Sequence, residues 1–242
     1  MRKPTVCILA AVERELAPLR RRENSSLWNL HWRVSGVGKA SGAAEATTAL
    51  CQLQPDLIVN IGCAGAFQPP SAETIPFPSI GDVVVGDCDI FADEGVDTAD
   101  GFKNLRELKL PTLTDDDGTL HNEVPLFVPP AALINQVANQ VASRFTLVTG
   151  PLLTVSTCSG TNALAAELAS RWSGLAESME GAAIALAGRR FGCPVVEIRA
   201  ISNYVGERSR ETWDIDGACE HAAQVVHFLL NSHLLLDALG HE

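Results

Sequence analysis

Short apolar runs alternate with helical patterns along nearly the whole chain, and this alternation restricts the possible fold more than any other feature. The apolar runs have the length of buried strands and lie within residues 6–11, 31–34, 56–62, 81–87, 146–157 and 194–201. Helical patterns begin near Glu13 and cover residues 39–53, 161–172, 181–191 and 216–239. Strands that alternate with helices predict an α/β protein with a central twisted, mostly parallel sheet flanked by helices on both faces.

The chain has 242 residues and contains no Ser-, Gly- or Pro-rich linker, which predicts a single domain over 1–242. Residues 88–130 break the alternation because they are rich in Asp and Pro. Such a long irregular stretch in a domain of this size is typically functional or an interface. We therefore expect a loop-rich insertion there that contributes to a pocket or to a subunit contact.

Charge and composition exclude several classes of partner. The formal net charge of −11 argues against a nucleic-acid-binding face, which would need a basic patch. No apolar run approaches the roughly 20 residues that span a bilayer, and the N-terminal run fits a first core strand better than a signal peptide. Seven cysteines without a C-x-x-C pair indicate reduced thiols in a cytoplasmic protein, and six histidines without i, i+4 pairing predict no metal site.

The glycine-rich segment "SGVGKASG" (35–42) resembles two nucleotide-binding motifs and satisfies neither. A P-loop would need glycine at Arg33 and a hydroxyl residue at Ala40, and a dinucleotide-binding turn would need glycine at Ser41. The segment by itself predicts a tight turn between a strand and a helix of small residues that packs closely.

Five segments in one order identify a resemblance that covers nearly the whole chain. They are "AAVERELAPL" (10–19), "SGVGKASGAAEAT" (35–47), "NIGCAGAF" (60–67), "ESMEGAAIA" (177–185) and "EIRAISNYVG" (197–206). Together they resemble the nucleoside phosphorylase and nucleosidase family, and "TVSTCSGT" (154–161) with "RAISNYVGERSRETW" looks most like its futalosine hydrolase branch, which serves the alternative menaquinone pathway. The resemblance implies the single-domain fold of that family, a small-molecule nucleoside substrate, no cofactor and a homo-oligomer.

The resemblance also implies catalytic carboxylates. Breaking an N-ribosidic bond passes through a sugar cation, so the site must bind the sugar, activate a nucleophile and donate to the departing base. Glu180 would accept hydrogen bonds from the ribose 2′- and 3′-hydroxyls, with Met179 against the sugar. Glu15 stands where related nucleosidases keep the base that activates water, and Glu13 is its rival two residues away.

Asn203 is the residue that would read the purine. Hypoxanthine offers two acceptors, O6 and N7, where adenine offers a donor beside an acceptor. An amide NH₂ can donate to such acceptors, whereas a carboxylate would be repelled by O6. Adenine-releasing members of the family carry Asp at this place, so Asn203 predicts a 6-oxopurine leaving group. The alternative is a simple turn residue after a strand.

The nucleophile is expected to be water. Phosphorylases of this family place an arginine where this chain has Asn60, and that loss removes the main bidentate phosphate ligand. The adjoining Cys63, Ala64 and Gly65 would lie near the nucleophile, with Cys63 acting through its backbone rather than its thiol.

The remaining residues are assigned to the site only from their positions in the sequence. Gly160 and Thr161 lie where the family presents main chain to the purine, and Ser202 would either bind near the base or cap the strand end. Arg208, with Arg210, is a candidate for the carboxylate of futalosine. Arg199 is expected to tie the strand end to a neighbouring carboxylate.

Three other functions stay open at this point. An adenine-releasing methylthioadenosine/adenosylhomocysteine nucleosidase is disfavoured by Asn203, and a 6-oxopurine phosphorylase by Asn60. A non-catalytic ligand-binding protein of the same fold would have no use for Glu15, Glu180 and Asn203 together.

Overall fold

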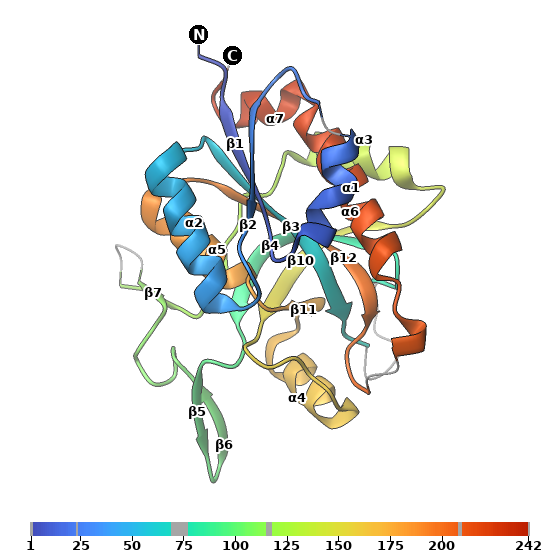
Figure 1. The fold of residues 1–242 in the computed structure, drawn as a ribbon. Coiled ribbons are helices and arrows are strands. Elements are labelled where there is room, and N and C mark those ends of the chain that lie inside the picture. The colour runs from blue at the N-terminus through green and yellow to red at the C-terminus, as the bar shows by residue number, and fades with distance from the viewer. Residues whose placement is uncertain (1, 23, 69–76, 115–117, 208–209, 242) are drawn as a thin grey trace.

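A mixed sheet of eight strands forms the centre of the molecule (Figure 1). The computed structural model describes residues 2–22, 24–68, 77–114, 118–207 and 210–241. The sheet has the order β11-β10-β4-β12-β3-β1-β2, and β9 pairs with β4. Its strands are β1 (Thr5–Ala10), β2 (Asn29–Val34), β3 (Leu57–Ala66), β4 (Val83–Phe91), β9 (Glu123–Pro125), β10 (Leu147–Thr154), β11 (Ala176–Ser178) and β12 (Val195–Tyr204).

Most strand pairs in this sheet are parallel, as the sequence predicts. The exceptions are the antiparallel pairs β12–β4, β4–β9 and β11–β3. The pair β11–β3 matters most for the site, because it joins the short strand β11, which also pairs with β10, to the end of the central strand β3, with Glu177 opposite Gly65. The sheet therefore curls at this end, and three strand ends meet there.

Helices cover both faces of the sheet (Figure 1). The helices are α1 (Glu13–Arg22), α2 (Lys39–Leu53), α3 (Ala131–Val141), α4 (Asn162–Trp172), α5 (Gly181–Phe191), α6 (Ile215–Leu230) and α7 (His233–Ala238). One face packs against α1, α3, α6 and α7, and the other against α2 and α5. The α/β architecture with a helix-covered mixed sheet is thereby confirmed.

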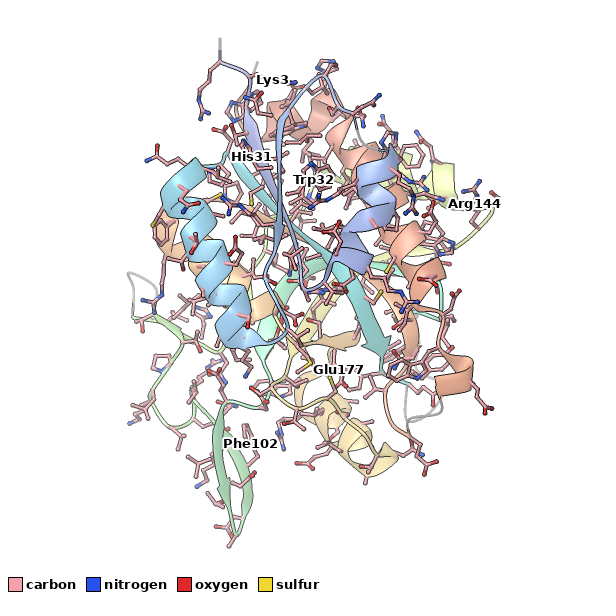
Figure 2. All side chains as sticks on the ribbon, in the orientation of Figure 1. Lys3, His31, Trp32, Phe102, Arg144 and Glu177 are labelled. Carbon is pink, nitrogen blue, oxygen red and sulfur yellow. The ribbon has the colours of Figure 1, made fainter. Side chains whose placement is uncertain are left out.

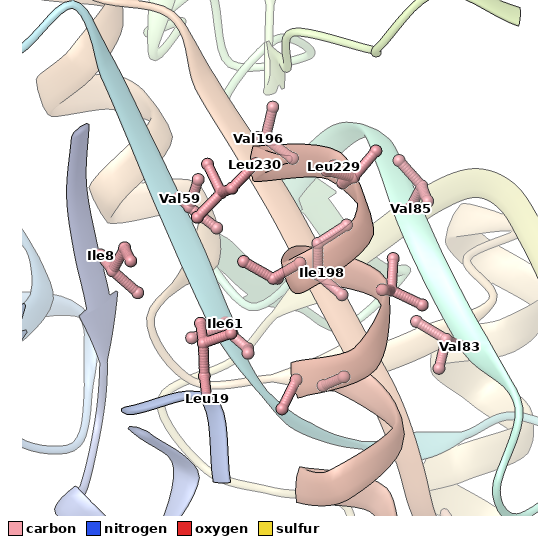
Figure 3. Packing of buried hydrophobic residues seen from close by; sticks show 14 of the residues in the cluster. Ile8, Leu19, Val59, Ile61, Val83, Val85, Val196, Ile198, Leu229 and Leu230 are labelled. Atoms are coloured by element: carbon pink, nitrogen blue, oxygen red, sulfur yellow. The ribbon is translucent and has the colours of Figure 1, made fainter. Parts of the chain in front are cut away.

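The larger core cluster lies between α6 and the central strands (Figure 3). Alternate residues of each strand point to this face, so Val59 and Ile61 of β3 and Val196 and Ile198 of β12 meet the apolar side of α6. All four side chains are at most 2% exposed. Burial of each such side chain stabilises the folded state by about 1.5–3 kcal/mol. This packing holds the central strands in place and so fixes the positions of the polar groups at their ends.

The helices on the other face approach the sheet closely through small residues. Gly42 of α2 faces α5, where a Cβ would lie 3.2 Å from both the Glu180 Cβ and Ile184. The turn before α2 needs Gly38, whose φ of 97° is in the left-handed region that favours glycine. The expected close strand–helix turn is therefore present.

Three elements differ from the sequence prediction. β3 runs past Gly62 to Ala66, because pairing with β12 and β11 supplies ladder bonds to a glycine-rich segment that reads as a loop. The final helix is interrupted at Asn231 and Ser232, where the Ser232 side chain accepts a bond from the N–H of Leu234 and starts α7. Helix α3 follows the two prolines at 129–130 and was not predicted, although its apolar residues repeat every three to four positions.

The region 88–130 also has more order than its composition suggests. Residues up to 91 complete β4, and β9 returns to pair with that strand. Between them lie two small hairpins, β5 (Gly95–Thr98) with β6 (Gly101–Asn104), and β7 (Leu113–Thr114) with β8 (Leu120–His121). The first hairpin projects away from the body of the molecule (Figure 1).

Candidate functional site

A cavity of about 340 Å³ lies where the ends of β3, β11 and β12 meet. This volume is within the range of small-molecule sites. The strand ends, the turn after β1 and the loop before α6 all contribute to its wall. Eight of the predicted site residues line it: Glu15, Cys63, Ala64, Gly65, Met179, Glu180, Ser202 and Asn203.

Two predicted residues do not line the cavity. Thr161 is exposed because its hydroxyl caps α4, where it accepts the N–H of Leu164 at 3.3 Å, and Gly160 is exposed beside it. Cys158 and Ser159 line the cavity instead, so the segment approaches the site two residues earlier than predicted. The predicted Arg208 lies outside the described residues.

Glu15 is held at the wall by backbone donors. It is 8% exposed, and its two carboxylate oxygens accept the N–H of Cys63 at 2.9 Å and that of Val12 at 3.2 Å. Burial raises the pKa of the Glu15 carboxyl, and this outweighs the opposing effects of Arg199 and of the two backbone donors. Glu13, the rival, has an exposed side chain that pairs with Arg20. The structure thus places Glu15, and not Glu13, in the cavity.

Arg199 lies directly behind Glu15 and is 1% exposed. Its Nε donates to Glu197 Oε1 at 2.7 Å, which confirms the predicted tie to a carboxylate. Sequence reasoning missed the rest of its role, because Arg199 Nη1 and Glu15 Oε1 approach each other across Gly62. A Cβ on Gly62 would lie only 2.5 and 2.6 Å from these two atoms. Glycine at this position therefore allows a guanidinium and a carboxylate to face the same point.

Glu180 precedes α5 and is 5% exposed. Its Oε1 accepts the N–H of Gly38 at 2.8 Å, and its Oε2 lies 3.9 Å from Arg199 Nη2. The glycine turn that resembles a phosphate-binding loop thus binds a carboxylate of the protein itself. The remaining lone pairs of Glu180 can accept hydroxyl groups of a ligand.

A bulge in β12 orients Asn203. Ile201 is opposite Ala64 and Asn203 is opposite Gly65, so Ser202 is an extra residue that the partner strand does not match. Asn203 Nδ2 donates to the carbonyl of Tyr204 at 2.9 Å, and the Ser202 hydroxyl lies 2.8 Å from Asn203 Oδ1. Because a carbonyl can only accept, the first bond fixes which side of the amide carries hydrogen. One N–H of the amide has no acceptor among the described residues.

Cys63 acts here through its backbone, as expected. Its N–H binds Glu15, while its thiol lies 3.4 Å from the sulfur of Cys219. The contact with Cys219, together with burial, raises the pKa of the Cys63 thiol, which keeps it protonated and a poor nucleophile.

Glu177 is another cavity residue that sequence reasoning missed, in addition to Cys158 and Ser159. It lies on β11 at the end of the sheet near α4 (Figure 2) and is 6% exposed. Its carboxylate accepts both the N–H and the hydroxyl of Ser159, at 2.9 and 2.8 Å. The only signal in the sequence was its place in the segment "ESMEGAAIA", two positions before Met179.

Over the described part of the chain, no group of three or more His, Cys, Asp or Glu residues is arranged to hold a metal ion. None of the helices described here has both the length and the apolar character to cross a membrane.

The chain is similar to known proteins over most of its length. A profile of the Phosphorylase superfamily matches residues 29–234. A futalosine hydrolase from Streptomyces coelicolor is 38% identical over 197 residues, which are 79% of this chain and 73% of that protein. A futalosine hydrolase from Acidothermus cellulolyticus is 35% identical over 193 residues, with 78% and 71% covered.

A solved structure shows the same fold. The 5′-methylthioadenosine/S-adenosylhomocysteine nucleosidase from Colwellia psychrerythraea, in complex with adenine, aligns with a TM-score of 0.77. The alignment covers 97% of this chain and 96% of that one at 22% identity. The overall fold of this chain is therefore shared with that enzyme.

Proposed function

The chain belongs to the phosphorylase superfamily, and on that premise we propose that it hydrolyses the N-ribosidic bond of futalosine, releasing hypoxanthine and dehypoxanthine futalosine. The observation that carries the proposal is the Asn203 amide, which lines the cavity with its NH₂ side fixed by the Tyr204 carbonyl. Relatives at 38% and 35% identity that act as futalosine hydrolases support the choice of substrate.

Glu15 is the proposed general base. Burial raises the pKa of its carboxyl group toward neutral pH. A carboxylate with a higher pKa is a stronger base and accepts a proton from water more readily. Arg199 lies behind it and favours the ionised form, so the carboxylate can accept a proton from a water molecule on its cavity side. The water gives its proton to Glu15 and attacks the anomeric carbon as the bond to hypoxanthine breaks, which yields dehypoxanthine futalosine and the free base.

Glu180 is the proposed sugar ligand. With one oxygen bound to Gly38 and the other 3.9 Å from Arg199, its position is set before substrate enters. Its charge also stabilises the sugar cation that develops as the base departs. Met179 lines the same part of the cavity and provides an apolar contact for the sugar.

Asn203 is proposed to donate to the departing hypoxanthine. One of its N–H groups binds Tyr204, which leaves one for the purine rather than the two that the sequence suggested. A single donor that faces O6 stabilises the developing anion and disfavours adenine, which presents its amino group at that position.

Water is the proposed nucleophile rather than phosphate. The cavity wall carries Glu15, Glu177, Glu180 and Glu207 against Arg14, and Arg14 is engaged by Asp216 at 2.8 Å. A phosphate dianion would be repelled by this wall. Asn60, which stands at the place of the arginine of phosphorylases, is 1% exposed and does not line the cavity.

The cellular context belongs to the same proposal. Futalosine cleavage would place the chain in menaquinone biosynthesis, acting in the cytoplasm as a homo-oligomer of two or more copies. The net charge of −11 supports a small-molecule partner rather than nucleic acid.

A substrate panel tests the proposal. Futalosine, inosine and methylthioadenosine are incubated with the protein, with and without phosphate, and the released base is identified by chromatography. We expect hypoxanthine from futalosine at a rate that phosphate does not change. Adenine release as the main activity would favour the methylthioadenosine nucleosidase, phosphate-dependent turnover would favour a phosphorylase, and no release would favour a ligand-binding protein.

A further inference from the structure

A second group of polar side chains lies behind the cavity, beneath the first residues of α5. Asp89 of β4, Thr154 of β10 and Glu197 of β12 are each 0% exposed, and none of them lines the cavity. Residues of this kind are rarely buried without partners that satisfy them.

The contacts of these groups leave one oxygen of each carboxyl unsatisfied. The Thr154 hydroxyl accepts the N–H of Ala182 at 2.8 Å and donates to Asp89 Oδ1 at 2.9 Å. Glu197 Oε1 accepts Arg199 Nε. Asp89 Oδ2 and Glu197 Oε2 have no hydrogen-bond partner within the described residues.

The two carboxyl groups converge at Gly181. A Cβ on Gly181 would lie within 2.6 Å of Asp89 Oδ2 and of both oxygens of Glu197. All three oxygens thus surround one point, at a depth where water does not screen their charges. Two ionised carboxylates in such a place repel each other strongly, and one of them normally takes up a proton.

The charges around the pair point the same way. Four buried carboxyl groups, those of Asp89, Glu197, Glu180 and Glu15, interact with Arg199. Within the described residues, Arg199 is the single cation that acts on them. Burial, followed by the neighbouring Glu197, raises the pKa of Asp89 well above its usual range, and Thr154 and Arg199 only partly oppose this.

In the described part of the chain, the charged groups that act on Asp89 are Glu197 and Arg199, both of β12. Beyond Glu197 and Arg199 of β12, β10 contributes the Thr154 hydroxyl and α5 the backbone at Gly181, while β9 places Val124 opposite Asp89 in the strand register.

We infer that Asp89 and Glu197 share one proton, that the remaining charge stays on Glu197, and that this pair positions Arg199 toward Glu15 and Glu180. The bond between Arg199 Nε and Glu197 at 2.7 Å holds the inner edge of the guanidinium. Its outer edge then faces Glu180 at 3.9 Å and approaches Glu15 across Gly62. Asp89 and Glu197 are positioning residues, because they act on the reaction only through Arg199. Their effect on turnover rests on the proposed function.

Two variants separate the members of the pair. Asp89→Asn keeps an acceptor for Thr154 and supplies a permanent N–H to Glu197, so we expect kcat within about twofold of wild type. Glu197→Gln removes the anion that orients Arg199, and we expect kcat to fall by tenfold or more with KM changed by less than threefold, because neither residue touches the substrate. An Asp89→Asn variant that loses as much turnover as Glu197→Gln would overturn the inference.

Two further measurements need no substrate. Infrared spectra at neutral pH should show the carbonyl band of a protonated carboxyl group in wild type that is absent from Asp89→Asn. Thermal unfolding should show that wild type loses stability relative to Asp89→Asn as pH rises above about 3.9, the ordinary Asp pKa. Folding raises the pKa of Asp89, so the folded state stays protonated where the unfolded state ionises, and the free energy of unfolding falls. Replacement of the exposed Asp97 by Asn should show neither change and serves as the control.

These measurements distinguish the two possible failures. If no nucleoside is cleaved, the proposed function fails while the infrared and unfolding data still decide the shared proton. If the infrared band is the same in wild type and Asp89→Asn, both carboxyls are ionised and the inference is wrong, whatever the activity.

Discussion

Replacement of Gly62 by alanine should separate the two charged groups at the nucleophile end of the cavity. A Cβ at this position would lie 2.5 Å from Arg199 Nη1 and 2.6 Å from Glu15 Oε1. Ordinary contact of a carbon with such atoms requires about 3.5 Å, so one or both groups must move by about 1 Å. A misplacement of this size can lower the rate about 100-fold. We expect kcat for futalosine to fall about 100-fold with KM changed by less than threefold.

The assay is steady-state release of hypoxanthine, combined with thermal unfolding of the same preparation. Overpacking of this kind destabilises a protein by about 1–3 kcal/mol, so a matched control is needed. Gly150→Ala supplies it, because its Cβ would lie 2.6 Å from Leu175 Cδ1, and neither Gly150 nor Leu175 lines the cavity. The control should lose stability and keep its turnover.

Two results would refute the reasoning. A folded Gly62→Ala protein that keeps more than a third of the wild-type kcat would show that Glu15 and Arg199 need not stay close. Equal losses of turnover in the two alanine variants would show that the effect comes from general destabilisation.

Three further predictions concern single groups of the site. Glu15→Gln should lower kcat by at least about 100-fold, as expected for loss of a general base, while exposed Glu13→Gln stays near wild type; the reverse would reassign the base. A general base works in its ionised form, and burial raises the pKa of Glu15. As pH decreases, kcat/KM should therefore begin to fall at a pH above the ordinary Glu pKa of about 4.3. A fall that begins only at or below that pH would contradict this role. Asn203→Asp places an oxygen where Nδ2 now lies 2.9 Å from the Tyr204 carbonyl, and this removes the N–H proposed to face the purine. Hypoxanthine release should therefore fall relative to adenine release by roughly 10- to 100-fold. An unchanged ratio in a two-substrate assay would remove Asn203 from base selection.

Local patterns were sufficient for most of the elements. The apolar run of β1 and the small-residue helix α2 were predicted with nearly their observed bounds, because side-chain spacing along the chain reports burial directly. The prediction was wrong at β3, where glycines continue a strand that only pairing with β11 and β12 stabilises, and at the junction of α6 and α7, where a cap at Ser232 interrupts a continuous apolar pattern.

Some residues of the candidate site could be chosen from the sequence, and others could be found only in the structure. Glu15, Glu180 and Asn203 could be chosen from the sequence, because each lies in a short segment that resembles the family. The structure was required to replace Gly160 and Thr161 by Cys158 and Ser159 and to include Glu177, and it also shows that Glu15 lines the cavity while Glu13 does not.

What the sequence determined by itself is the set of strands and helices and the types of side chain that end them, since these follow from neighbours within one or two turns. What only the tertiary structure decided is which of those groups meet. Arg199 faces Glu15 because Gly62, on another strand, leaves room for both, and Asp89 meets Glu197 because β4 lies beside β12. Distances between residues far apart in the chain depend on how the sheet is assembled, and no local pattern contains them.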